Sequence, residues 1–435
     1  MDRVRSALAW NGITDNHEAG LGAVFPIRPP HGGAGGAAFA VVGNGIGRFA
    51  FTPLLPMMLH DGLLDLQGGS WLATANYLGY FVGAALCAAV PFLLRHGSAS
   101  RQVSAATIVK AGLVVTAILT LAMAVEWPEG WLLWRFLSGV TSAVVFVYTS
   151  SWCLQTLAGM EASALGGIIF MGPGVGIIVT GLMTTAMVAC GWHAETGWLA
   201  YGALAVLLAA LVWPVVRNRS ATPQSAPARQ NQPQESATKQ APKQGLSSNR
   251  NEIIFLAAIY GLAGFGYIIT ATYLPVIARE SLPASQWADL FWPVFGLGVA
   301  LGALLVTRLP LHWDQRDLLV GGYMVQAAGV LACVLFPSVP GFVLGSLLTG
   351  APLTALTLFA MREVRRLNPL MASSLMGLLT AVYGIGQILG PPLATALVSV
   401  DSAGRADFSL SLYVAASALL GGAAGSFFLR LRYPA

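Results

Sequence analysis

Apolar residues follow one another in twelve stretches of about 20 residues or more, separated by short polar segments. A helix rises about 1.5 Å per residue, so each stretch is long enough to cross a hydrocarbon layer of about 30 Å. A spanning segment must satisfy its own backbone hydrogen bonds, which favours helices. The pattern predicts twelve transmembrane helices at residues 36–59, 69–94, 102–125, 130–157, 162–189, 194–216, 253–278, 287–309, 318–337, 339–361, 370–400 and 408–429.

The composition favours an all-α membrane protein over a water-soluble one. The 435 residues are 56% hydrophobic and only 9% charged, whereas soluble domains carry about 25% charged residues. The four cysteines lie in apolar stretches and lack the spacing of a metal site or a disulfide framework, so they are predicted to be small core residues. They are Cys87, Cys153, Cys190 and Cys333.

The basic residues sort by loop. Most of the 23 lie in the N-terminal segment, in every second loop and at the C-terminus, while the alternate loops carry only Arg279 and Arg405. This bias predicts that both termini lie in the cytoplasm. The chain is expected to be an integral protein of the bacterial inner membrane. Residues 1–35 have no signal-peptide pattern and are predicted to be a disordered cytoplasmic extension. Because the basic residues form no single patch, a nucleic-acid partner is not expected.

Residues 217–251 divide the chain into two halves. They are rich in Pro, Gln, Ser and charged residues, and they are predicted to be a disordered cytoplasmic linker between six helices at 36–216 and six at 252–435. An internal repeat supports two halves of like topology. At an offset of 219 residues, Gly45, Gly47, Pro56, Gly79 and Gly83 coincide with Gly264, Gly266, Pro275, Gly298 and Gly302. Further along, Gly139 and Gly166 coincide with Gly350 and Gly377 at an offset of 211.

Local motifs resemble those of the major facilitator superfamily. Residues 135–143 match its Arg-x3-Gly-x3-Ala pattern, and Gly172-Pro173-Gly174-Val175-Gly176 is similar to its fifth-helix Gly-Pro motif. The segments 43–56 and 75–80 look like the YbfB/YjiJ branch, and the resemblance covers all twelve predicted helices. It implies two pseudo-symmetric six-helix bundles and transport of a small organic solute by alternating access.

Arg48 is the most informative single residue. It lies roughly 17 Å from either end of the first predicted helix, too far to snorkel to the interface. A charge at that depth costs about 2.5–3.5 kcal/mol, so it is expected to face a partner or a wet site. All 18 acids and all 6 histidines fall in loops or at helix ends, which leaves Arg48 without a countercharge at its depth.

An unpaired guanidinium favours an anionic ligand, because its fork matches a carboxylate. The repeat places Tyr267, not a second Arg, opposite Arg48, which favours an organic monoanion. In the alternative interpretation Arg48 pairs with helix carbonyls or another buried group. Arg135 fits helix packing or coupling as well as it fits solute contact. The predicted solute contacts are Arg48, Asn44, Thr52, Tyr77, Tyr80, Arg135, Tyr267, Tyr383 and Gln387.

Small residues and prolines are predicted to allow close helix approach or gating. They are Gly45, Gly47, Gly139, Gly172, Pro173, Gly176, Gly390 and Pro391. The run Gly390-Pro391-Pro392 is predicted to break or kink the eleventh helix.

Motifs for other chemistry are absent from the sequence. It has no Gly-x4-Gly-Lys-Ser/Thr, no metal-ligand spacing and no catalytic dyad, so an ATP-driven pump, a cofactor and an enzyme are not expected. Gly45-x-Gly47-x-x-Ala50 lies inside an apolar span, so it is not a dinucleotide motif. The sequence predicts a monomeric secondary transporter in the lipid bilayer, with protons as candidate coupling partners. The alternatives are an exporter of amphipathic or cationic compounds and, less favoured, a channel or a membrane sensor.

Overall fold

The computed structural model describes residues 45–94, 104–158, 171–214, 246–283, 285–310, 312–369, 371–400 and 404–433. Ten helices in these ranges are long and apolar enough to cross a membrane, and a shorter apolar helix covers 106–122. With the described part of the first helix, they confirm the predicted all-α fold of twelve helices.

The first half contains α3 (Gly47–Phe49), α4 (Phe51–His60), α5 (Leu66–Leu94), α6 (Ala105–Ala122), α7 (Pro128–Ala158), α8 (Gly172–Ala189) and α9 (Ala194–Val212). The second half contains α10 (Leu246–Ser281), η3 (Ala288–Leu290), α11 (Phe291–Arg308), α12 (Gln315–Leu335), α13 (Val339–Gly350), α14 (Pro352–Leu367), α15 (Ala372–Ala396) and α16 (Ser409–Arg432). The strands β1 (Ser399–Val400) and β2 (Ala406–Asp407) form an antiparallel hairpin between α15 and α16.

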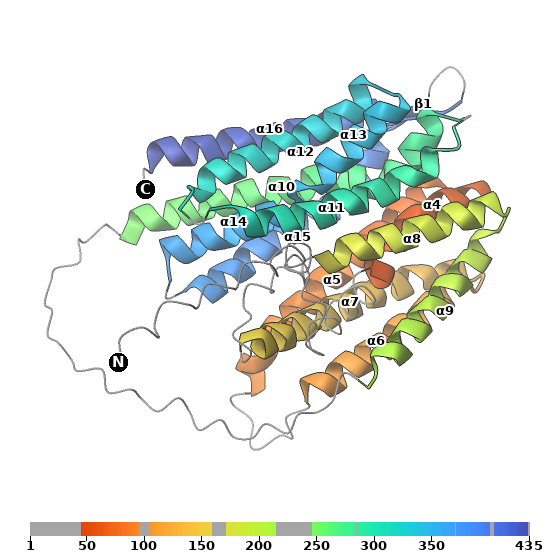
Figure 1. The fold of residues 1–435 in the computed structure, drawn as a ribbon, viewed down its shortest axis with the longest axis horizontal. Helices are drawn as coiled ribbons and strands as arrows, with labels where there is room; N and C mark the ends of the chain where they lie inside the picture. Colours follow the sequence, from red (N-terminus) through yellow and green to blue (C-terminus); the bar gives the residue numbers. More distant parts are fainter. Residues whose placement is uncertain are drawn as a thin grey trace, which may run out of the picture.

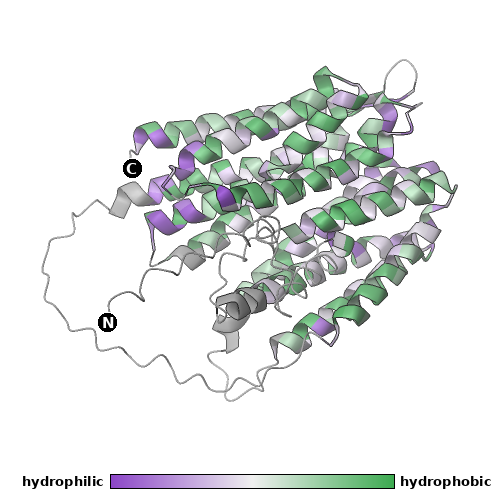
Figure 2. Ribbon diagram, viewed as in Figure 1, coloured by the Kyte–Doolittle hydropathy of each residue, from purple (hydrophilic) through white to green (hydrophobic). Residues whose placement is uncertain are grey.

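The helices run side by side along the long axis of the molecule (Figure 1). The start of α10 and the end of α16 lie at one end, called here the linker end, and the β1–β2 hairpin lies at the other, called the hairpin end. Hydrophobic residues colour the middle of the helices, and hydrophilic residues gather toward the two ends (Figure 2). This distribution fits helices whose central parts face hydrocarbon.

Equivalent glycine contacts in the two halves support the repeat. A Cβ at Gly83 of α5 would lie 2.6 Å from the Val140 carbonyl oxygen of α7, and one at Gly302 of α11 would lie 1.8 Å from the Ala351 carbonyl oxygen. Both distances are far below van der Waals contact. Only glycine lets the second helix of each half approach the fourth this closely.

The partner helices repeat the pattern. A Cβ at Gly139 would lie 2.1 Å from the Asn76 carbonyl oxygen, and one at Gly350 would lie 2.4 Å from the Phe295 carbonyl oxygen. Asn76 and Phe295 are themselves separated by the offset of 219. The backbone contacts therefore repeat while the side chains diverge from polar to aromatic.

The first helix is interrupted beside Arg48. The predicted helix at 36–59 is described from residue 45 and divides at Ala50 into α3 and α4. Pro53 explains the interruption, because it has no N–H to bond the carbonyl of Phe49 and its ring crowds that carbonyl. Residues 36–44 of this predicted helix, and 162–170 of the fifth, lie outside the described residues.

Three other predicted boundaries were wrong in the second half. The tenth helix divides at Ala351, since Pro352 cannot continue the hydrogen-bond ladder, and its second part continues to Leu367. The eleventh ends at Ala396 because residues 399–400 pair with 406–407 in the hairpin. The seventh begins at Leu246, so the last residues of the predicted 217–251 linker are helical.

The two halves meet through three helix pairs. α5 packs against α15, α8 against α11, and α4 against α10. Hydrogen bonds join the halves from the level of Arg48 toward the hairpin end. The Tyr77 hydroxyl lies 2.8 Å from Thr272 Oγ1, and Thr185 Oγ1 donates to the Asp289 carbonyl oxygen at 3.3 Å.

Candidate functional site

Arg48 lies buried between the halves, with 9% of its surface exposed. Its Nη2 donates to Gln387 Oε1 at 2.9 Å, and its Nε has no hydrogen-bond partner among the described residues. The guanidinium carbon lies 4.0 Å from the centre of the Tyr80 ring, so this ring covers one face of the cation. In the described ranges no carboxylate pairs with Arg48, and the titratable side chains that act on it most strongly are tyrosines.

Gln387 links Arg48 to the second half. Its Nε2 donates to the Tyr267 hydroxyl, and Gln387 and Tyr267 are both buried. Tyr383 lies 4.7 Å from Tyr260 and 5.9 Å from Tyr267 between ring centres, stacked on both. Arg48 and Tyr267, which the repeat places at equivalent positions, are thus neighbours in space, and the Gln387 amide bridges them.

Arg135 lies in the same region but has different neighbours. It is 2% exposed, and its guanidinium carbon lies 4.7 Å from the centre of the Phe51 ring on α4. Its backbone carbonyl and that of Gly47, next to Arg48, both accept from Asn76 Nδ2. The region therefore holds two guanidinium groups for which no ion pair with a described carboxylate is found.

Asn76 fixes the helices around Arg48, a role that the sequence did not reveal. Its Nδ2 donates to the carbonyl oxygens of Arg135 at 3.0 Å and Gly47 at 3.3 Å, and Ser138 Oγ donates to Gly47 at 2.8 Å. These bonds tie α5 and α7 to the first helix at the residue before Arg48. The only signal in the sequence was an amide in an otherwise apolar stretch.

Gly45 and Gly47, two of the glycines predicted for close approach, lie close to neighbouring helices. A Cβ at Gly45 would lie 2.8 Å from the Cα of Gly176, and one at Gly47 would lie 2.4 Å from Ser142 Oγ. Gly172 and Pro173 form the first turn of α8, where proline needs no hydrogen-bond donor.

The eleventh helix is not broken at its prolines. α15 continues through Pro391 and Pro392 to Ala396, and a Cβ at Gly390 would lie 2.3 Å from Ile268 Cγ2 on α10. The Pro391 carbonyl oxygen accepts from the Tyr273 hydroxyl at 3.4 Å. The chain thus stays helical past the two prolines.

The structure thus brings most of the predicted contacts together. Arg48, Gln387 and Tyr267 form one hydrogen-bonded chain, with Tyr80, Tyr77 and Tyr383 beside it. Thr52 is buried one turn further along the first helix. Asn44 lies outside the described residues. Thr272, the partner of Tyr77, was missed because the sequence does not show which helices pair across the halves.

A second group of charges was also missed. Arg316 on α12 is 1% exposed; its Nε donates to Glu363 at 2.7 Å, its Nη2 to Glu252 at 2.5 Å, and its Nη1 to the Tyr433 carbonyl oxygen. These groups join α10, α12, α14 and the end of α16 at the linker end. The charges are paired within one half, which is the arrangement of a structural clamp and not of an open binding site.

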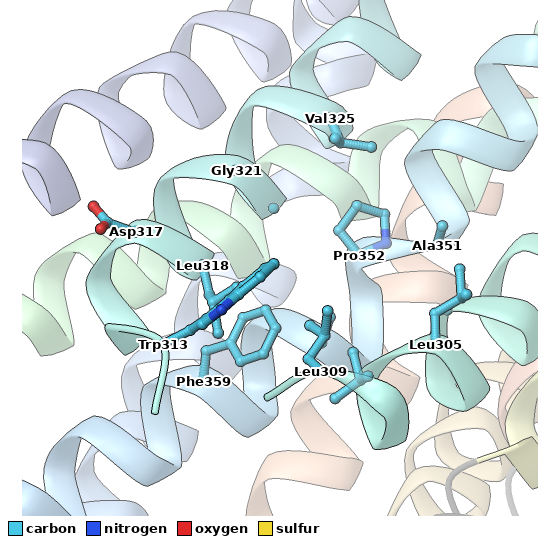
Figure 3. Close-up of a pocket in the computed structure, with 14 residues that line it drawn as sticks. Leu305, Leu309, Trp313, Asp317, Leu318, Gly321, Val325, Ala351, Pro352 and Phe359 are labelled. Carbon is cyan, nitrogen blue, oxygen red and sulfur yellow. The ribbon is translucent and has the colours of Figure 1, made fainter. Parts of the chain in front are cut away.

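An apolar groove lies between α11, α12 and α14 (Figure 3), and Arg48 is not among the residues that line it. It has a volume of about 430 Å³ and is lined mainly by Leu, Val, Gly, Trp and Phe side chains. Its one acid, Asp317, is bound to Arg430 at 2.6 Å. Solute sites need convergent polar groups to orient the ligand, so this groove is not the solute site. The described chain also contains no group of three or more His, Cys, Asp and Glu side chains that could hold a metal.

Two repeated six-helix halves, with a buried guanidinium between them, define an MFS-type membrane transporter and not an enzyme. The chain belongs to the family described as "Uncharacterised MFS-type transporter YbfB", which it matches over residues 40–424.

Solved structures with the same fold include the nucleoside transporter NupG and a point mutant of NupG. The chain is 15% identical to each; the match covers 92% of this chain and 98% of NupG with a TM-score of 0.70, or 99% of the mutant with a TM-score of 0.69. At this identity the likeness concerns the fold alone. A comparison with curated proteins gives no match.

Proposed function

We propose that this chain is a secondary transporter that carries an organic monoanion by alternating access, with Arg48 as the group that binds the anion. One observation carries the proposal: Arg48 is buried, yet its hydrogen-bond partner is a neutral amide and no described carboxylate pairs with it. Taking a cation out of water costs several kcal/mol unless a countercharge is supplied. An anionic solute supplies that charge.

Arg135 strengthens the positive field of the same region. Its guanidinium is buried and packs on the Phe51 ring, in the helix that begins three residues after Arg48. We assign solute contact to Arg48, whose hydrogen bond spans the halves, and assign the field around it to Arg135. The second half offers Tyr267 in place of another cation, which favours one negative charge on the solute.

Export of cationic compounds fits the charges less well, because a cation would need a free carboxylate within the spans. Glu252 and Glu363 are buried in the described spans, but both are bound to Arg316 at the linker end. For the same reason we infer that the carrier exchanges anions or carries its proton on the solute. The described contacts of Arg48 all come from one chain, and we infer that the carrier works as a monomer.

We further infer that the linker end faces the cytoplasm, because basic residues such as Arg308, Arg365 and Arg430 lie at that end of their helices. Reporters fused within residues 217–245 and at both termini of the chain should all give cytoplasmic signals. A reporter in the linker that reads as periplasmic would reverse the orientation.

The test of function uses purified protein in detergent and in liposomes. A thermal-shift screen compares organic monoanions with the neutral amides of the same carbon skeletons, and counterflow is then measured for each anion that stabilises the protein. Arg48→Lys keeps the charge but loses the planar fork, so counterflow should fall by about 100-fold. Arg430→Lys, the same change in an exposed ion pair, should transport like wild type. Stabilisation by cations alone, or full counterflow by Arg48→Lys, contradicts the proposal.

A further inference from the structure

The hydrogen-bonded chain Arg48–Gln387–Tyr267 resembles a site with its ligand already in place. Arg48 belongs to α3 in the first half, and Gln387 and Tyr267 belong to α15 and α10 in the second. Gln387 is 3% exposed and approaches Arg48 to 2.9 Å. The amide therefore holds the two halves together at the position where an anion would bind.

We propose that the side-chain amide of Gln387 occupies the place of a substrate carboxylate on Arg48, that Tyr267 holds the amide there, and that the transported anion is a carboxylate which displaces it. The proposal rests on the proposed function, because it takes Arg48 as the anion-binding group. It adds the chemical class of the anion and the residue with which the anion competes.

The donors of Arg48 support a planar, two-oxygen ligand. Nη2 and Nε point to the same side of a guanidinium; on Arg48 the first is bound to the amide oxygen and the second has no described partner. The same two nitrogens on Arg366 bind both oxygens of Glu363, at 2.8 and 3.0 Å. An amide offers one acceptor where a carboxylate offers two and a charge, so a carboxylate satisfies Arg48 more fully.

The neighbours of Arg48 select against bulkier anionic groups. Tyr80 covers one face of the guanidinium, 4.0 Å between its carbon and the ring centre, which leaves the edge of the cation for the ligand. A carboxylate lies in the plane of that edge, as an amide does. A sulfonate or phosphonate places a third oxygen out of the plane and does not match the volume that the amide fills.

Tyr267 sets the orientation of the amide. Arg48 has no acceptor, so it must face the oxygen of Gln387, and the NH2 group must then face the Tyr267 hydroxyl. The hydroxyl accepts that hydrogen bond and so anchors the amide in the place where its oxygen faces the cation. Tyr267 is thus a positioning residue that acts through Gln387.

The exchange of partners connects binding to movement of the halves. While the amide is bound, a hydrogen bond joins α3 to α15; when a carboxylate takes its place, that bond between the halves is lost. The contacts that remain between Tyr77 and Thr272 lie toward the hairpin end. Binding therefore removes one of the links that hold the halves in the present arrangement.

The first experiment compares ligands on the wild-type full chain. Carboxylates, sulfonates and amides on matched skeletons, such as benzoate, benzenesulfonate and benzamide, are screened by thermal shift across a range of skeleton sizes. We expect stabilisation by carboxylates only. Equal stabilisation by matched sulfonates overturns the carboxylate assignment but leaves anion transport intact. If no anion of any class stabilises the protein, the proposed function itself fails.

The second experiment uses variants and the best carboxylate from that screen. Gln387→Glu is nearly isosteric and supplies a permanent carboxylate to Arg48, so carboxylate affinity should fall by about 100-fold. Gln387→Leu removes the competitor, so affinity should rise by about threefold or more. Elution profile and melting temperature report folding. If Gln387→Glu binds like wild type, or Gln387→Leu binds more weakly than wild type, the proposal is wrong.

If Gln387→Glu does not fold, Tyr267→Phe tests the same proposal. It should raise carboxylate affinity in the same direction as Gln387→Leu, by about twofold. The double variant Tyr267→Phe/Gln387→Leu should match Gln387→Leu alone, because the hydroxyl acts only through the amide. Independent, additive effects of the two changes overturn the positioning role of Tyr267.

Discussion

The two halves share their backbone contacts but keep their charges in different places. In the first half Arg48 and Arg135 lie buried among aromatic rings, and no ion pair with a described carboxylate is found for either. In the second half Arg316 lies at the linker end, bound to Glu252 and Glu363. Glycine spacing thus sets the helix packing of both halves. Charge placement differs: the first half holds buried guanidinium groups for which no described carboxylate is found, and in the second half Arg316 and Arg366 together balance two carboxylates.

The largest difference between the halves is expected when Arg316 and Arg48 are each replaced by Met. Arg316→Met leaves the buried Glu252 without its described partner and leaves Glu363 with Arg366 alone, so it should destabilise the protein by about 3–5 kcal/mol. Arg48→Met strands no described carboxylate. The loss of its hydrogen bond to Gln387 is offset by the removal of a buried charge. The free energy of unfolding should therefore change by no more than about 1 kcal/mol.

Both values are measured as free energies of unfolding in mixed micelles. Arg430→Met is the control, since its bond to Asp317 is exposed and worth about 0–1 kcal/mol. Equal losses for Arg48→Met and Arg316→Met would show that Arg48 has a strong structural partner.

Equivalent glycines should respond alike in the two halves. Gly83→Ala and Gly302→Ala each place a methyl group against a backbone carbonyl, at 2.6 and 1.8 Å before relaxation. Each should cost about 1–3 kcal/mol through overpacking. Gly321→Ala is the matched control, because a Cβ there meets nothing within 4 Å, so helix propensity alone should make it neutral or stabilising. If only one of the two changes lowered the stability, the halves would share glycine spacing in the sequence but not the same close helix contact.

Asp61 offers a smaller, pH-dependent test in the first half. Partial burial acts to raise the pKa of its carboxyl, but hydrogen bonds from the Ala194 amide and from His193 and His60 hold that pKa below its ordinary value of 3.8. Its Oδ2 caps α9, at 2.7 Å from the Ala194 nitrogen. Asp61→Ala should therefore cost about 0.5–2 kcal/mol at neutral pH.

The pH dependence follows from the lowered pKa. The charged cap contributes fully above about pH 4, and its contribution is lost as the pH falls further through the lowered pKa. Asp61→Asn keeps an acceptor for the Ala194 amide but no charge. The melting temperatures of wild type and Asp61→Asn should therefore converge below about pH 4, and a constant gap would contradict the assignment.

The smallest effect is expected at Asp289, in the second half. It binds Arg279 at 2.7 Å in a partly exposed pair near the hairpin end. If Arg48 is the charge that governs the cycle, Asp289→Asn should leave counterflow largely intact and cost about 0–1 kcal/mol of stability. The same holds for Glu126→Gln and Glu161→Gln, of which Glu161 lies outside the described residues. Loss of counterflow in a folded Asp289→Asn protein would show that a carboxylate is essential to transport.

Hydropathy and spacing in the sequence determined the fold. Spans of apolar residues fix the helices because unpaired backbone groups are too costly in hydrocarbon, and glycine spacing records where backbones touch. Arg48 could be placed at mid-depth by counting along its helix. The boundaries near Pro53 and Pro352 and at the β1–β2 hairpin could not be placed in this way, because such breaks depend on which nearby groups replace the missing hydrogen bonds.

Only the tertiary structure decided which groups meet. Gln387 lies 339 residues after Arg48, and Arg316 meets Glu252 and Glu363 from three different helices. A side chain near the end of a predicted helix reads as exposed, so nothing in the sequence indicated that Glu363 is buried. Its burial depends on a cation brought by another helix, since charges leave water only when a partner arrives with them. The helices are a local property of the chain, and the pairing of charges is a property of their packing.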